Sequence, residues 1–159
     1  MEDIQPYGIP KKKAPFRPWN MEFNTFLMLM HISQFASMIV PMAGWILPIA
    51  MWAQFKEENE LIDKNGKQIL NFMLTFVIYI IGMVILYLVG FIMLITMAED
   101  SQGSGLDSGA WIPILLLVIW LILLSILVIG HSIVIILAGI KANKGQVGTY
   151  PLTIKFFKS

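Results

Sequence analysis

The chain has 159 residues, of which 57% are hydrophobic and only 13% are charged. An ordinary soluble domain carries about 25% charged residues, and a domain this short has too little interior to bury such an apolar excess. These values argue against a soluble enzyme, a disordered tail and a secreted scaffold, and they predict a single-domain integral membrane protein. The absence of cysteine excludes disulfides and thiolate metal sites.

Three long stretches, 23–55, 68–98 and 108–140, contain no Asp, Glu, Lys or Arg. Each is longer than the roughly 20 residues that a helix needs to cross a bilayer. The head of the chain carries four basic residues, the loop after the first stretch carries three and the tail carries four, whereas the loop before the third stretch carries none. The positive-inside rule therefore predicts a cytoplasmic head, first loop and tail, with the acidic second loop outside.

Three simple crossings would place the two ends of the chain on opposite sides, so the first stretch is expected to fold back. Pro41, Gly44 and Pro48 supply a place to turn, because proline breaks the helical ladder and glycine permits a turn. We expect helices at about 22–40 and 45–56, the short second one being either a re-entrant arm or a fourth span. The alternative is one kinked helix that crosses once.

Two long spans, at about 66–97 and 111–141, complete the predicted fold. This fold is an all-α integral membrane protein, a small helical bundle with a broken or re-entrant first hairpin and both termini cytoplasmic. The expected organisation is an extended basic head at 1–21, a membrane helical domain at 22–145 and a short strand-like cytoplasmic tail at 146–159. The tail alternates apolar and polar residues, and it is expected to dock on the protein or on headgroups, or to pair with a partner chain.

The head combines four prolines with aromatic and basic residues. Its cations Lys11, Lys12, Lys13 and Arg17 suit anionic lipid headgroups. Nucleic-acid binding is the alternative for such a segment, but cations beside a span are usually a topology signal, so we expect no nucleic-acid partner.

Ionisable side chains inside a span are functional candidates, and the chain has only two histidines, His31 and His131. Counted from the cytoplasmic face, both are predicted at a similar depth, where they could meet or line one cavity. With Gln34 and Asn71 they form a hypothetical intramembrane polar cluster. Such a cluster could be a proton relay or ligand site, or it could only hold helices together. No metal is expected, since the spans contain no carboxylate or thiolate.

Small residues at helical spacing predict close helix packing. They are Thr75, Gly82, Ser125, Ser132 and Gly139. No nucleophile elbow, P-loop, zinc-protease or dinucleotide motif occurs, so we expect neither an enzyme nor a cofactor.

Three further stretches stand out, around the hairpin turn, the start of the second span and the end of the third. The residues that mark the last two are Gly66, Lys67, Asn71, Lys141, Asn143, Tyr150 and Pro151. In this order they resemble a domain-of-unknown-function family of small bacterial membrane proteins, distantly similar to the twenty-kilodalton subunit of the chloroplast inner-envelope protein translocon. The resemblance covers about 25–158. It implies a four-helix-type membrane bundle with both ends cytoplasmic, no enzyme activity and no established cofactor.

The sequence thus predicts a multi-pass protein of the bacterial inner membrane that acts as an accessory or structural subunit of a larger complex. By resemblance alone, that complex would serve protein translocation or the envelope. The expected partners are the lipid bilayer and other membrane subunits or a second copy. The alternative is a small oligomeric transporter or proton-coupled channel that uses His31 and His131.

Overall fold

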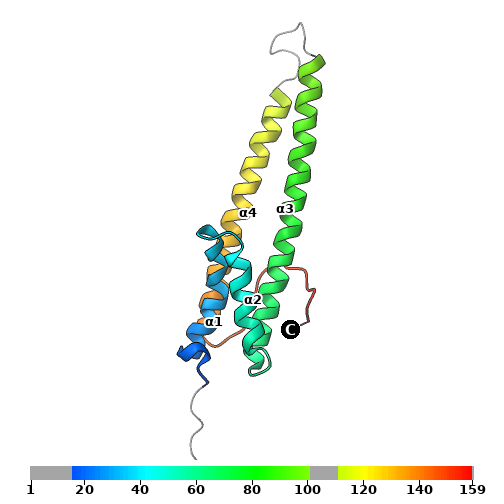
Figure 1. The fold of residues 1–159 in the computed structure, drawn as a ribbon. Helices are drawn as coiled ribbons and strands as arrows, with labels where there is room; N and C mark the ends of the chain where they lie inside the picture. The colour runs from blue at the N-terminus through cyan, green and yellow to red at the C-terminus, as the bar shows by residue number, and fades with distance from the viewer. Residues whose placement is uncertain (1–15, 101–110, 159) are drawn as a thin grey trace, which may run out of the picture.

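The computed structural model describes residues 16–100 and 111–158 (Figure 1). In chain order the described elements are the 3-10 turn η1 (Pro18–Asn20), α1 (Phe23–Ile32), the 3-10 helix η2 (Ser33–Met38), α2 (Ala43–Phe55), α3 (Glu60–Asp100) and α4 (Trp111–Asn143). Figure 1 shows α3 and α4 running side by side along the whole molecule, with α1 and α2 packed against one end of them.

The chain folds back between η2 and α2, in the region where the sequence predicts a turn. Met42 adopts a left-handed conformation, with φ of 69°, and the Gly44 amide donates a hydrogen bond to Ser37 Oγ at 3.0 Å. A Cβ on Gly44 would lie 2.1 Å from the carbonyl oxygen of Gln34, so only glycine permits this approach. Pro48 is buried inside α2. The first arm differs from the expected helix at 22–40, because after Ile32 it tightens into η2.

The helix α3 begins earlier than its predicted start near residue 66. Asn59 Oδ1 accepts hydrogen bonds from the backbone N–H groups of Leu61 and Ile62, at 2.9 and 3.4 Å, and so caps the helix. Gly66 therefore lies within α3, where a Cβ would come 1.9 Å from Cδ1 of Trp52. The helix α4 begins with Pro113 in its first turn, where a missing N–H removes no hydrogen bond.

Both long helices have the length and composition needed to cross a membrane. The 41 residues of α3 and 33 residues of α4 correspond to about 60 and 50 Å at about 1.5 Å per residue. In their most apolar windows, 0% and 6% of the residues are buried. A core helix of a soluble protein would be buried there, so these helices fit a membrane location.

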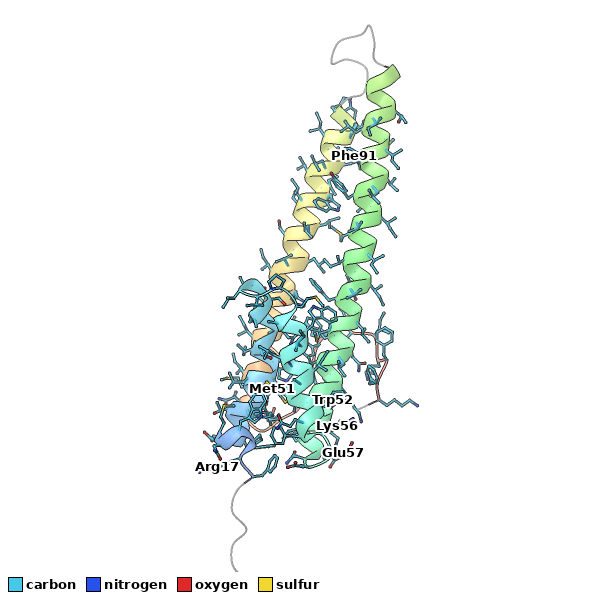
Figure 2. All side chains as sticks on the ribbon, viewed as in Figure 1. Arg17, Met51, Trp52, Lys56, Glu57 and Phe91 are labelled. Atoms are coloured by element: carbon cyan, nitrogen blue, oxygen red, sulfur yellow. The ribbon has the colours of Figure 1, made fainter. Side chains whose placement is uncertain are left out.

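The buried core occupies only one end of the bundle. We call this end, which comprises residues 16–79 and 129–158, the proximal half, and the rest of α3 and α4 the distal half. The core residues are Phe26, Leu27, Met30, Met51, Ile62, Ile69, Phe72, Met73, Ile135, Ala138, Ala142 and Tyr150. In the distal half, apolar side chains project outward from both helices (Figure 2). The described ends of the chain both lie in the proximal half.

The tail does not form the strand that its alternating sequence predicts. Residues 147–158 adopt turns and extended backbone without a strand. A strand requires a neighbouring backbone, whereas several tail N–H and C=O groups here bond to side chains of α3.

Candidate functional site

His31 lies at the centre of a buried polar network that joins α1, α3 and the tail. Its Nε2 lies 2.8 Å from Asn65 Oδ1, and its Nδ1 lies 2.5 Å from the hydroxyl oxygen of Tyr150. The same Asn65 oxygen accepts the backbone N–H of Gly148 at 2.8 Å, and Asn65 Nδ2 donates to a backbone carbonyl. Asn65 Oδ1 is therefore an acceptor toward His31, so Nε2 carries the proton and Nδ1 accepts the Tyr150 O–H.

Gln34 completes this network from η2. Its Nε2 donates to the Tyr150 hydroxyl at 2.9 Å and to the carbonyl of His31 at 3.1 Å. The Tyr150 hydroxyl thus donates once and accepts once, and both ring nitrogens of His31 have partners. Such a closed set of neutral hydrogen bonds holds a polar core in one arrangement.

Burial favours the uncharged forms of these groups. His31 is fully buried, and its ring donates one hydrogen bond and accepts another, as a neutral imidazole does. Burial raises the pKa of the Tyr150 hydroxyl far above 10, with the Gln34 hydrogen bond acting in the opposite direction.

Gly148 and Asn65 are members of this network that the sequence analysis did not single out. Gly148 is buried, and a Cβ on it would lie 2.6 Å from Cε1 and Nε2 of His31 and 2.9 Å from the carbonyl oxygen of Ala138. Glycine therefore lets the tail backbone touch the imidazole. A tyrosine two residues after a glycine is too common a pattern to have revealed this contact.

His131 lies on the other side of an aromatic stack from His31. Tyr150 stacks on Phe72 with ring centroids 4.1 Å apart, Phe72 stacks on His131 at 4.7 Å, and His131 stacks on Phe76 at 3.8 Å. The two histidines therefore lie in one region of the proximal half but are separated by the Tyr150 and Phe72 rings.

His131 differs from His31 in its bonding. Its Nδ1 is enclosed and has no hydrogen-bond partner among the described residues. The imidazole lines a cavity of about 280 Å³ between α3, α4 and the tail. This cavity is lined by Phe72, Thr75, Phe76, Tyr79, Ile126, Leu127, Gly130, His131, Val134, Pro151 and Leu152. His31 is not among them.

Asn71 binds the tail instead of either histidine. Its Oδ1 accepts the backbone N–H groups of Phe156 and Phe157 at 2.9 and 2.8 Å, and its Nδ2 donates to the Phe157 carbonyl at 2.9 Å. The four residues proposed as one polar cluster thus form three separate arrangements: a network with His31 and Gln34, a tail contact at Asn71 and a stack at His131.

Thr75 and Tyr79 extend this tail contact along α3. Thr75 Oγ1 accepts the N–H of Ile154 at 3.0 Å, and the Tyr79 hydroxyl donates to the Leu152 carbonyl at 2.8 Å. Tyr79 was not foreseen, although its spacing of four residues from Thr75 and eight from Asn71 places all three on one helix face.

The small residues proposed for helix packing differ in what they contact. A Cβ on Gly139 would meet Ile32 Cδ1 at 3.1 Å, so this glycine lies at the contact between α1 and α4. Around Gly82 a Cβ would meet nothing within 4 Å. The hydroxyls of Ser125 and Ser132 donate to carbonyls four residues back on their own helix.

Other charged and polar positions lie at the proximal end. Lys67 Nζ lies 2.6 Å from Asp63 Oδ2, and Lys141 Nζ donates to Thr149 Oγ1 at 3.1 Å. Asn143 is exposed at the end of α4, and Arg17 is exposed next to η1. The headgroup residues Lys11, Lys12 and Lys13 lie outside the described residues. Among the side chains that the structure describes, those of 16–96 and 111–158, no group of three His, Asp or Glu could hold a metal ion.

One protein-family model matches most of the chain. The model of the magnetosome magnetite crystal formation protein family matches residues 22–157. The chain belongs to this family. The match covers the hairpin, both long helices and the tail that closes the His31 network. No curated protein and no solved structure matches the chain, so the expected similarity to a translocon subunit is not shown.

Proposed function

We propose that this chain is a non-enzymatic accessory or structural subunit of a protein complex, in a membrane where magnetite crystals form. The observation that carries this proposal is the closed bonding of the His31 network. Both ring nitrogens of His31 and the Tyr150 hydroxyl bond within the chain, which leaves this network to hold α1, α3 and the tail together instead of serving a substrate. Family membership supplies the link to magnetite.

We further propose that α3 and α4 cross the bilayer with both chain ends in the cytoplasm. The basic residues support this orientation, since every Lys and Arg in the sequence lies outside the 68–140 region. The hairpin would then be re-entrant from the cytoplasmic side. Its tip supports insertion, because the apolar side chains of Met38, Ile39, Val40 and Met42 are exposed there.

This topology can be tested with single cysteines, since the chain has none of its own. Cysteines introduced by Glu58→Cys and Ser104→Cys should react with a membrane-impermeant maleimide from opposite sides. Glu58 is exposed between α2 and α3, so its substitution leaves the core unchanged. Labelling of both positions from the same side would contradict the two crossings.

The role in crystal formation is tested by removing the chain from a magnetite-forming cell. We expect electron microscopy to show fewer or smaller crystals, with recovery when the chain is restored. Unchanged crystals would contradict the proposal. Purification in mild detergent identifies the complex, and co-purification with protein-export components instead of magnetite-forming membranes would favour the translocation role implied by resemblance.

A transporter or proton-coupled channel is the second candidate, and the unpartnered Nδ1 of His131 is the observation that favours it. His131→Phe separates the two functions, because a phenyl ring can retain the stacking on Phe72 and Phe76 while losing both nitrogens. A structural subunit should still support crystals with this variant. Lost crystals with normal protein levels, together with lost proton flux in proteoliposomes, would favour transport. His31→Phe is less informative because it also breaks the buried network.

A further inference from the structure

In the tail segment 151–158, backbone N–H and C=O groups form hydrogen bonds with side chains of α3. Asn71, Thr75 and Tyr79 lie one helical turn apart and supply donors and acceptors along the segment. The tail runs antiparallel to α3, with Leu152 beside Tyr79 and Phe157 beside Asn71. Three side chains thus act toward the tail as a neighbouring strand would.

The apolar side chains of the tail are exposed to a large extent. Leu152 is 86% exposed, and Ile154, Phe156 and Phe157 are each more than 40% exposed. Apolar side chains exposed to this extent are favourable where lipid, instead of water, covers them.

The surface of α3 beside the tail is also apolar, and the end of the tail is basic. On α3, Val77, Ile78 and Ile81 are exposed at the level where the tail begins. Two cations, Lys155 and Lys158, are exposed near its end. Apolar side chains interleaved with lysines match the boundary between hydrocarbon and anionic headgroups, where lysine stems lie in the apolar layer and their ammonium groups reach the phosphates.

We propose that segment 151–158 is embedded in the cytoplasmic leaflet of a bilayer containing anionic lipid. Extended backbone enters hydrocarbon only where protein satisfies its polar groups. Asn71, Thr75 and Tyr79 do so for the N–H groups of Ile154, Phe156 and Phe157 and for the C=O groups of Leu152 and Phe157. Leu152 lies deepest and Lys158 lies at the headgroups. This inference rests on the proposed crossing of the bilayer by α3.

Spin labels on single cysteines test the depth of the tail. Leu152→Cys and Phe156→Cys place the label on exposed side chains, so the backbone hydrogen bonds to α3 are kept. Ile85→Cys, on the exposed surface of α3, is the lipid control, and Lys144→Cys, exposed after α4, is the water control. Accessibility to oxygen and to a water-soluble nickel complex is measured in vesicles of phosphatidylglycerol and phosphatidylcholine.

We expect the labels at positions 152 and 156 to resemble the label at 85, with position 152 more protected from nickel than 156. If they resemble the label at 144 while position 85 stays protected, the embedded tail is overturned. If position 85 is itself open to nickel, the crossing by α3 fails instead, so the two failures are distinguishable.

The lipid charge is tested by the same labels in vesicles of phosphatidylcholine alone. Position 156 should become more accessible to nickel than in the anionic vesicles. The double variant Lys155→Gln, Lys158→Gln should abolish this difference. Equal accessibility in both vesicle types for the unsubstituted lysines would overturn the assignment to anionic lipid.

Discussion

Gly148 and Tyr150 together decide how the tail meets the bundle at the scale of single residues. The absent side chain of Gly148 lets the backbone lie against the His31 ring, and the Tyr150 side chain then reaches the same ring from the other edge. Each residue depends on the other, because a displaced backbone at 148 would withdraw the tyrosine hydroxyl from its partners.

We expect Gly148→Ala to destabilise the protein by about 1–3 kcal/mol, the usual cost of overpacking a core. The new Cβ would meet the His31 ring and a backbone oxygen, and two hydrogen bonds hold that ring in place. Thermal unfolding in detergent would measure the effect. Gly130→Ala is the matched control, since a Cβ there meets nothing within 4 Å. An equal response of both variants would contradict the close contact.

Tyr150→Phe should cost about 1–3 kcal/mol, because His31 Nδ1 would lose its donor and Gln34 would lose an acceptor in a buried site. The ring and its stacking on Phe72 remain. Tyr87→Phe, on the half-exposed surface of α3, should change the unfolding temperature far less. A neutral Tyr150→Phe would show that the hydroxyl does not organise the network.

The tail and α3 form one unit at the scale of elements. Asn71, Thr75 and Tyr79 lie on one face of α3 and bond to the tail backbone at three levels. The hairpin depends on a similar local fit, since Gly44 permits α2 to lie against the end of η2. In both cases a small number of polar or small side chains replaces a large apolar interface.

Thr75→Val should loosen the tail while leaving the bundle folded. Valine has nearly the same shape but cannot accept the N–H of Ile154, so amide exchange over 151–158 should become several-fold faster by mass spectrometry. Thr96→Val is the control, because the Thr96 hydroxyl donates to a carbonyl of its own helix, Met93 O. Unchanged exchange in the Thr75 variant would contradict the role of this hydroxyl.

The whole molecule has two halves with different stabilising forces. The proximal half has a packed core and a buried polar network, whereas the distal half exposes its apolar side chains and relies on its surroundings to cover them. His31 links three elements of the proximal half, so its protonation state affects the stability of the entire bundle.

Acidification should therefore destabilise the fold. Protonation of His31 Nδ1 would remove the acceptor of the Tyr150 O–H and would place a charge at a fully buried site. The stability that neutral His31 supplies is therefore lost as the pH falls. Comparing unfolding between pH 7 and 4 with that of His31→Gln isolates the effect. Equal pH dependence in both proteins would contradict it.

Much of the helical architecture could be predicted because helices that face lipid carry their signal locally. Charge-free stretches mark α3 and α4, and Pro41 and Gly44 mark the turn between η2 and α2. The helix ends were less predictable, since the start of α3 depends on the Asn59 cap and the end of α1 on a change to 3-10 geometry. Gly66 suggested a helix start from sequence, but its role is to accommodate Trp52.

The candidate site was only partly predictable. His31, Gln34, Asn71 and Tyr150 are visible as unusual residues, but their partners are not, because a polar side chain in an apolar stretch can bond to many groups. The tail illustrates the limit: its alternating pattern indicates a strand, while its backbone partners are side chains of α3.

The sequence by itself determined the class of protein and the two long helices, because hydrophobic length and charge placement act locally along the chain. Only the tertiary structure decided which polar residues meet. Gly148, Asn65 and Tyr150 reach His31 from sequence separations of 34 to 119 residues, and contacts over such distances depend on how the helices pack, which no local pattern encodes.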